Sequence, residues 1–169
     1  MASLAVRNVL FSLVVPGLGA VVGPWLVLRS TGGQVRAWYG VVLIAAGLAL
    51  YVICVRAFAV VGRGTPGPWD APRRVVTVGP YRWVRNPIYL SALMVVIGEA
   101  WLFLSWSLVV YAAVMAVCFH LFVIAYEEPH LRREFGASYD DYAQRVHRWV
   151  PRRSPLEDAP AGTRTGQRR

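Results

Sequence analysis

Two clusters of charged and aromatic residues, separated by a long apolar stretch, hold the side chains that could do chemistry. The first cluster, 79–89, reads Gly-Pro-Tyr-Arg-Trp-Val-Arg-Asn-Pro-Ile-Tyr. The second is the carboxylate pair Glu127-Glu128, which follows a stretch, 86–126, whose one formal charge is Glu99. If that stretch folds back as a helical hairpin, the two clusters meet on one side of a membrane. Arginines, tyrosines and carboxylates would then surround a polar cofactor whose substrate comes from the lipid.

The hydropathy pattern of the chain is typical of a membrane protein. Of its 169 residues, 56% are hydrophobic, and uncharged runs occupy 9–28 and 37–55. A helix crosses a hydrocarbon core of about 30 Å with about 20 residues, so the stretch 86–126 allows about two crossings. We therefore expect an all-α integral membrane protein with about four transmembrane helices, near 8–29, 37–61, 87–104 and 106–126. No strong turn signal fixes the boundary between the third and fourth helices.

The chain changes character after Glu128. Apolar residues recur there every three or four positions with arginine and aspartate between them, which predicts C-terminal amphipathic helices at the cytoplasmic face, closing the site from below. Past Pro151 the composition predicts disorder. Three regions follow: an N-terminal transmembrane helix pair over 1–62, a cofactor-binding region over 63–151 and a disordered tail over 152–169.

The charge pattern indicates orientation. All 18 basic residues are arginine, the formal net charge is +9, and the arginines gather in 56–85 and after 127. The positive-inside rule then places both termini in the cytoplasm. Because membrane spans separate the arginines, an anionic leaflet explains them better than nucleic acid, which we do not expect as a partner. The lysine-free, alanine- and valine-rich composition suggests a bacterium with a GC-rich genome, and hence its inner membrane.

The start of the third expected helix has two interpretations. Proline is favoured in the first helical turn and asparagine before it is a plausible cap, so Asn86 and Pro87 could be purely structural. Alternatively, Arg82 and Arg85 beside a helix N-terminus would form an anion site, for instance for a carboxylate. The residues alone leave both interpretations open.

The carboxylates are equally open to two interpretations. Glu127 and Glu128 could pair with Arg132 on a solvated helix face, or they could bind an ammonium group or ribose hydroxyls. Glu99 lies inside the third expected helix, where a carboxylate usually marks function unless it reaches water at the outer interface. His120 shares a helix face with Glu127, either as a hydrogen-bonded core residue or as a catalytic one.

No metal site is expected. Cys54 and Cys118 lie inside expected spans, and neither they nor the histidines show metal-ligand spacing. The phosphate-binding glycine motif that ends in lysine is also missing from the sequence.

Several segments nevertheless resemble a known family, and they occur in that family's order. They are Gly79-Pro80-Tyr81-Arg82, Arg85-Asn86-Pro87-Ile88-Tyr89, Glu127-Glu128, Phe135-Gly136-Ala137-Ser138-Tyr139-Asp140-Asp141-Tyr142, and Arg145-Val146 through Pro151. Together they resemble the isoprenylcysteine carboxyl methyltransferase family, whose plan the related phospholipid N-methyltransferases share. The resemblance covers roughly 63–151.

This resemblance implies a membrane enzyme that uses S-adenosylmethionine without a Rossmann fold. The cofactor-binding residues that it implies face the cytoplasm under the C-terminal helices: Tyr81, Arg85, Asn86, Pro87, Tyr89, Glu127 and Glu128. Arg145, in the closing motif, would position an acceptor carboxylate. Glu128, Glu99 or His120 would take the proton of an amine or thiol acceptor. The expected catalytic residues are therefore Arg145, Glu128 and Glu99.

One position departs from the family pattern. The family commonly has histidine where this chain has Asn86. Asparagine keeps a hydrogen-bond donor and an acceptor but carries no proton near neutral pH, so a role as acid or base is excluded at this position.

The function that we expect is methyl transfer from S-adenosylmethionine to a lipophilic acceptor, such as a prenylcysteine-like carboxylate. Three alternatives stay open: a phospholipid or amine N-methyltransferase, an NADPH-dependent enzyme of the sterol-reductase type, and a non-catalytic membrane protein, which Asn86 would favour. The expected partners are a lipophilic small molecule or lipid and the membrane itself.

Overall fold

The computed structural model describes residues 18–57 and 75–156, and every regular element in these ranges is helical. The α-helices are α2 (Gly23–Thr31), α3 (Gly40–Ala57), α4 (Pro87–Phe103), α5 (Trp106–Phe122), α6 (Glu128–Phe135) and α7 (Ala137–Arg145). Three shorter turns accompany them: the π-helical η1 (Leu18–Val22) and η4 (Val123–Glu127), and the 3-10 turn η3 (Gly79–Arg82). The all-α prediction is thus confirmed for the described residues.

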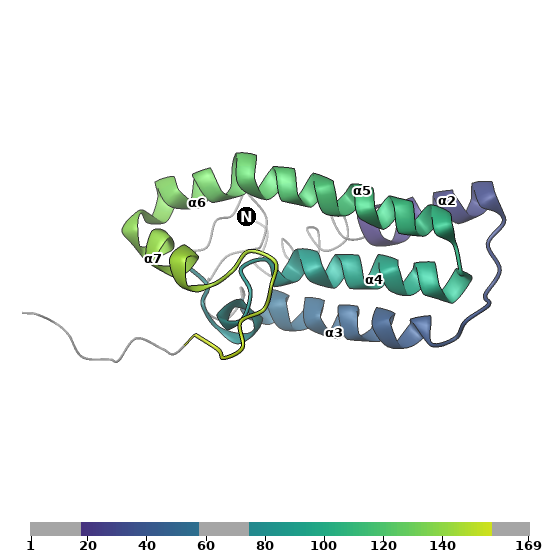
Figure 1. Ribbon diagram of the computed structural model, residues 1–169, viewed down its shortest axis with the longest axis horizontal. Helices are drawn as coiled ribbons and strands as arrows, with labels where there is room; N and C mark the ends of the chain where they lie inside the picture. The colour runs from purple at the N-terminus through teal and green to yellow at the C-terminus, as the bar shows by residue number, and fades with distance from the viewer. Residues whose placement is uncertain (1–17, 58–74, 157–169) are drawn as a thin grey trace, which may run out of the picture.

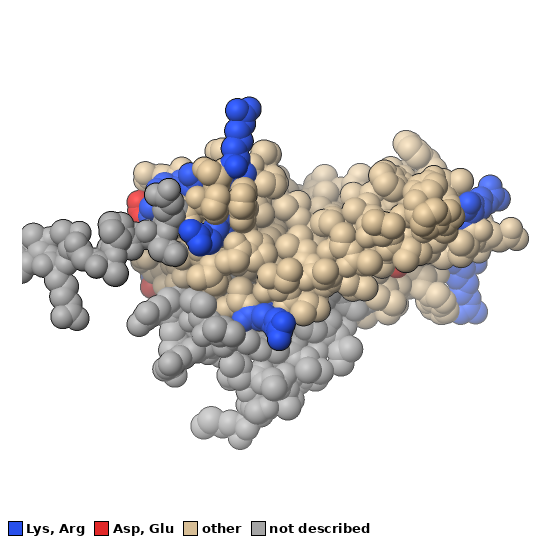
Figure 2. Space-filling view, turned by 90° about the horizontal axis from the view of Figure 1, so that it is seen from below, with Lys and Arg blue, Asp and Glu red and all other residues tan. Residues whose placement is uncertain are grey.

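The helices α3, α4 and α5 lie side by side along the long axis, with α4 between the other two (Figure 1). The helix α6 continues α5 beyond the end of α4, and α7 folds back beneath it (Figure 1). On the face that Figure 2 shows, arginine side chains gather toward the two ends of the molecule, and few charged residues lie between them.

The hairpin between α4 and α5 turns within two residues. Leu104 adopts a left-handed conformation (φ 47°), and the Ser105 hydroxyl accepts a hydrogen bond from the backbone N–H of Leu108, which caps α5. The expected third span at 87–104 and the start of the fourth at 106 therefore agree with the structure. The fourth helix is longer than expected, because the chain stays helical from Trp106 to Phe135.

Within 18–57 and 75–156, two helices are long and apolar enough to cross a membrane, Gly40–Ala57 and Trp106–Phe135. The helix α4 is apolar but has 17 residues. The expected first span at 8–29 lies partly outside the described residues, and α2 itself has nine residues. The four-span arrangement and the amphipathic character of the last helices therefore stay predictions.

Glycines bring α3 and α4 into backbone contact. A Cβ atom on Gly47 would lie 2.8 Å from the Ser91 carbonyl oxygen, and one on Gly98 would lie 2.9 Å from the Gly40 carbonyl oxygen. Small residues at a helix interface allow this close approach where lipid supplies no hydrophobic driving force. The packing holds α4, which carries Asn86 and Tyr89, against α3.

The segment 146–156, the C-terminal strap, returns from α7 across the residues that precede α4. The backbone N–H of Arg85 donates to the His147 carbonyl (2.9 Å), and that of Leu156 donates to the Arg82 carbonyl (2.9 Å). Leu156 is buried against Tyr139 and Tyr142. The packed chain thus continues beyond residue 152, where we expected a disordered tail to begin, and the remainder of that tail, 157–169, lies outside the described residues.

Candidate functional site

The paired glutamates lie at an irregularity in the long helix. Pro129 has no N–H to donate to the preceding turn, and the helix adopts the π-helical turn η4 immediately before it. Such turns are frequent at functional sites because they change the direction of side chains along a helix. Here Glu127 ends the π-helical turn and Glu128 begins α6.

Glu128 lies at the centre of an arginine cage, formed by Arg85, Arg132 and Arg148. Glu128 is only 3% exposed. It accepts two hydrogen bonds from Arg148: Arg148 Nε donates to Oε1 at 2.6 Å, and Arg148 Nη2 donates to Oε2 at 2.9 Å. Arg85 Nη1 lies 3.1 Å from Oε1, and Arg132 Nη2 lies 3.9 Å from Oε2. Because Arg148 donates these bonds to Glu128, the pKa of Arg148 is raised and its guanidinium stays charged. A buried carboxylate needs such partners.

The arginine cage has capacity for a further anion. Arg132 is shared with Asp140, whose Oδ1 lies 3.1 Å from Arg132 Nε, so the guanidinium groups of Arg85 and Arg148 face the single carboxylate of Glu128 and leave one positive charge in excess. Among the described residues, the Nε atom of Arg85 is buried without a hydrogen-bond partner. Because buried donors are nearly always paired, this atom indicates an acceptor that a ligand would bring.

Glu127 has a different environment from its neighbour. The Tyr89 hydroxyl donates a hydrogen bond to its Oε2 atom (2.6 Å), and within the described part of the chain no arginine pairs with it. A carboxylate without a cationic partner suits an ammonium group or a hydroxyl. Glu127 and the arginine cage together are therefore complementary to a zwitterion, with its cation at Glu127 and its anion at Arg85.

Asn86 does not cap α4 through its side chain, so that part of the structural interpretation is wrong. It occupies the N-cap position, 7% exposed, but makes no side-chain capping bond. Its Nδ2 atom instead donates to the Arg148 carbonyl oxygen at 3.1 Å. Pro87 lies in the first turn of α4, as expected. The Asn86 amide thus holds the backbone of the residue whose guanidinium binds Glu128.

Two of the residues that we expected to be catalytic lie outside this cluster. Arg145, at the end of α7, is exposed and pairs with Asp141 one turn earlier on the same helix. Glu99 lies 13 residues beyond Asn86, or about 20 Å along α4 at 1.5 Å per residue. Its Oε2 atom is buried without a hydrogen-bond partner among the described residues.

Tyr81 reaches the site indirectly. It is buried against Cys54 and Val76, and its carbonyl oxygen accepts a hydrogen bond from the Tyr142 hydroxyl (2.8 Å). This bond ties η3, which leads to Arg85, to α7.

Sequence reasoning missed Arg148, the strongest partner of Glu128. Arg145 and Arg148 stand three positions apart in the same closing segment, and the helix α7 ends between them, with Val146 in extended conformation (φ −120°, ψ 127°). The chain turns toward Glu128 only after that change. The available signal was a second arginine in the closing segment 145–151.

Within the described residues, the structure thus combines two helices that are long and apolar enough to cross a membrane with a cluster of buried charged residues near the start of α4 and of α6. Residues 35–138, more than half of the chain, match the phospholipid methyltransferase family. The chain belongs to this family. The matched range contains Asn86 and both glutamates, whereas the strap with Arg148 lies beyond it.

Two curated relatives have similar sequences. The chain is 32% identical over 114 residues to proteins of Oryza sativa subsp. indica and Oryza sativa subsp. japonica, each named probable protein-S-isoprenylcysteine O-methyltransferase. The match covers 62% of this chain and 59% of each relative.

Proposed function

We propose that this protein is an S-adenosylmethionine-dependent methyltransferase that acts on a lipophilic acceptor at the membrane. One observation carries the proposal: Glu127, without a cationic partner in the described part of the chain, adjoins an arginine cage with excess positive charge. The amino-acid end of S-adenosylmethionine has the matching ammonium and carboxylate groups. The family, and relatives named as methyltransferases, support the class of reaction.

The residues at the site fit this cofactor. Arg85, with its unpaired Nε atom, would hold the cofactor carboxylate, and Glu127, oriented by Tyr89, would hold the ammonium group. Glu128 would fix the arginines in place. Asn86 and Pro87 would set the start of α4, and Tyr81 would anchor the preceding turn. When bound, the cofactor supplies an electrophilic methyl group on a sulfonium centre.

A carboxylate acceptor fits the arginine cage best. Such an acceptor is already ionised and needs no general base, so the protein's tasks are to orient it and to exclude water. Arg148 is suited to hold it through its Nη1 group, because its Nε and Nη2 atoms are already bonded to Glu128. We assign this role to Arg148 rather than Arg145, which pairs with Asp141 on an exposed helix face. The distance of Glu99 from Asn86 argues against a direct role.

A phospholipid amine is the second candidate acceptor, because the family is described as phospholipid methyltransferases. An amine would have to lose a proton during the reaction, and because Glu127 is assigned to the cofactor ammonium group, another base would have to take that proton. The orientation that we propose, with the site and both termini cytoplasmic in a bacterial inner membrane, gives either acceptor access from the lipid.

Transfer of a radiolabelled methyl group tests the proposal. Purified protein in detergent is given labelled S-adenosylmethionine with N-acetyl-S-farnesyl-L-cysteine, or with phosphatidylethanolamine. Label released by mild base from the farnesylcysteine product would establish a methyl ester, and base-stable label in the lipid would establish N-methylation. The proposed activity would be refuted if the parent protein labelled neither acceptor above the background seen with Glu127→Gln.

A further inference from the structure

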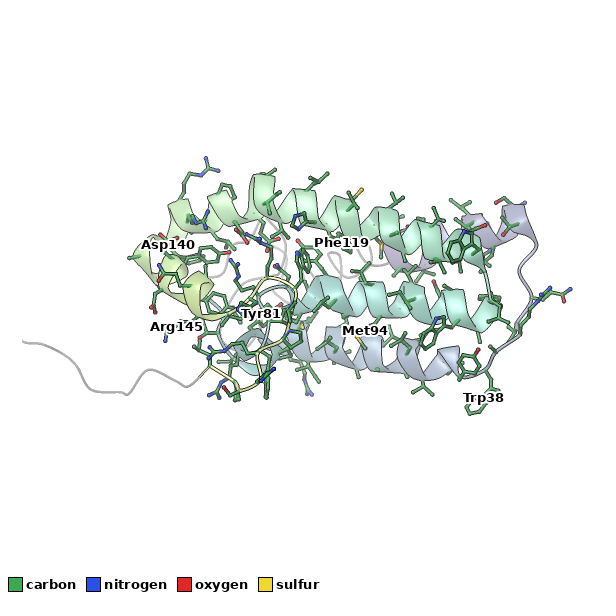
Figure 3. All side chains as sticks on the ribbon, in the orientation of Figure 1. Trp38, Tyr81, Met94, Phe119, Asp140 and Arg145 are labelled. Carbon is green, nitrogen blue, oxygen red and sulfur yellow. The ribbon has the colours of Figure 1, made fainter. Side chains whose placement is uncertain are left out.

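A tryptophan of the C-terminal strap is fastened to the long helix. The Trp149 Nε1–H donates a hydrogen bond to His120 Nδ1 at 3.0 Å, and the centroids of the two rings lie 6.2 Å apart. The Trp149 ring also lies edge-on to Tyr89, at 6.3 Å between ring centroids. Tyr89 in turn packs on Phe119 at 4.8 Å. Figure 3 shows Phe119 between α5 and α4, near the end of the hairpin that holds the site.

The position of Trp149 separates two surfaces of different character. On one side is Tyr89, whose hydroxyl donates to Glu127. On the other is the outer face of α5, where His120 lies between Val117 and Leu121, which are 58% and 54% exposed. A hydrocarbon chain lying along this exposed apolar face would meet Trp149 before its polar end reached Glu127.

The hydrogen bond to His120 explains how the ring is kept there. An indole N–H at an apolar boundary needs an acceptor, because lipid supplies none. His120 supplies it from a different element, so the bond fixes the orientation of Trp149 and joins the strap to α5. The Trp149–His120 pair is therefore a tertiary contact between the strap and α5 rather than a pair of separate surface residues.

We infer that Trp149, held by His120, is the acceptor-side gate of this site and determines which lipophilic acceptors are used. The inference rests on the proposed methyltransferase function. The matching acceptor has a hydrocarbon chain next to its reacting polar group, so that the chain lies on α5 while the polar group passes the indole ring. Trp149 is then a specificity-determining residue, and His120 is a positioning residue that acts through it.

The first test is a comparison of acceptor kinetics in four variants. Trp149→Ala removes the gate, whereas Trp149→Phe and His120→Ala remove the hydrogen bond and keep an aromatic ring at 149. Trp38→Ala is the matched control, because Trp38 is 76% exposed at the opposite end of the molecule (Figure 3). The acceptors are N-acetyl-S-farnesyl-L-cysteine and its shorter dimethylallyl analogue.

We expect Trp149→Ala to change the ratio of the two acceptors' kcat/KM values about tenfold, equivalent to ~1.4 kcal/mol. Trp149→Phe and His120→Ala should change it in the same direction but less, and Trp38→Ala should leave it unchanged. The Kd for S-adenosylmethionine should stay within about twofold in all four variants, which also shows that they fold. An unchanged acceptor ratio in Trp149→Ala would overturn the inference.

A binding experiment separates the gate from the proposed function. A farnesylcysteine probe with a photoreactive diazirine in its chain is cross-linked to the protein, and the labelled peptides are mapped by mass spectrometry. Labelling of α5 near 117–121 and of the strap, displaced by excess unlabelled farnesylcysteine and reduced in Trp149→Ala, supports the gate even if no methyl transfer is found. Labelling elsewhere, or labelling that the variant does not alter, refutes it even if the protein is a methyltransferase.

Discussion

Arg148 binds Glu128 through two parallel hydrogen bonds, at 2.6 and 2.9 Å, and so fastens the C-terminal strap to the start of α6. The two residues are 20 positions apart in the chain. Because the Arg148 carbonyl is held by Asn86 at the same time, one strap residue connects α4 with α6. The arginine cage is therefore complete only when the strap is in place.

This relationship predicts unequal roles for two neighbouring arginines. Arg148→Ala should lower the free energy of unfolding by about 1–2 kcal/mol, less than for a fully buried pair because Arg85 still neutralises Glu128. It should also weaken binding of S-adenosylmethionine. Arg148→Lys should recover little, because lysine cannot form the two-bond fork.

The matched control is Arg145→Ala, three positions earlier. Arg145 pairs with Asp141 on an exposed helix face, and such pairs contribute about 0–1 kcal/mol. Thermal unfolding and cofactor titration of both variants provide the comparison. Equal effects at the two positions would contradict the assignment of Arg148 to the site.

Asn86 gives a prediction about its hydrogen-bond donor. Asn86→Asp replaces the donating amide by an acceptor opposite the Arg148 carbonyl, which should cost about 1–3 kcal/mol of stability. Asn86→His, which keeps an N–H donor, should restore most of the stability and of the cofactor affinity. If aspartate is tolerated, or if histidine is as damaging as aspartate, the Asn86 amide does not hold the strap.

The glycine contact between α3 and α4 predicts a steric effect far from the charged residues. Gly47→Leu should destabilise the protein by about 1–3 kcal/mol, because the new side chain meets backbone that cannot move aside. Val52→Leu, on an exposed face of the same helix, should leave the unfolding temperature nearly unchanged. A neutral Gly47→Leu would show that the two helices are not this close.

The attachment of the strap should weaken at high pH. Burial raises the pKa of Tyr142, whose hydroxyl donates to the Tyr81 carbonyl, above its ordinary value of 10.0, and it raises the pKa of Tyr139 as well. A group whose folded pKa is raised contributes stability that is complete below its unfolded pKa and is lost as the pH rises further. The free energy of unfolding should therefore fall above about pH 10.

Tyr142→Phe isolates the contribution of this hydroxyl. The variant should be less stable near neutral pH, because the bond to Tyr81 is missing, but should lose less stability between neutral and alkaline pH. Chemical denaturation across that range measures both quantities. A pH dependence identical to that of the parent protein would refute the role of Tyr142.

The helical hairpin could be predicted because it depends on simple properties of the sequence. The stretch 86–126, with Glu99 as its one formal charge, has the length of two helices, and polar residues lie at its ends, so folding it back brings the two polar clusters together. In the structure the two clusters meet, with a hydrogen bond of 2.6 Å between the Tyr89 hydroxyl and Glu127. The turn itself was less visible, because Leu104 adopts a left-handed conformation without glycine.

The strap could not be predicted in the same way. Its contacts with 82–86 are hydrogen bonds to backbone atoms, which carry no sequence signal. A helix cap was one of the two interpretations of the segment around Asn86, since an asparagine before a proline has that local preference, whereas here a distant carbonyl takes its amide. Arg145 rather than Arg148 was favoured because it matches the closing motif of the family that the chain resembles, whereas in the structure α7 ends between the two residues and Arg148 bonds to Glu128.

Equilibrium binding of S-adenosylmethionine to the purified protein tests the central claim most directly. NADPH serves as the competing cofactor, Glu128→Gln as the variant that disturbs the arginine cage, and Trp38→Ala as the control. We predict saturable binding of S-adenosylmethionine, weakened at least about tenfold in Glu128→Gln and unchanged in Trp38→Ala, with no binding of NADPH. Absence of S-adenosylmethionine binding to the parent protein, or equal binding by Glu128→Gln, would contradict the account.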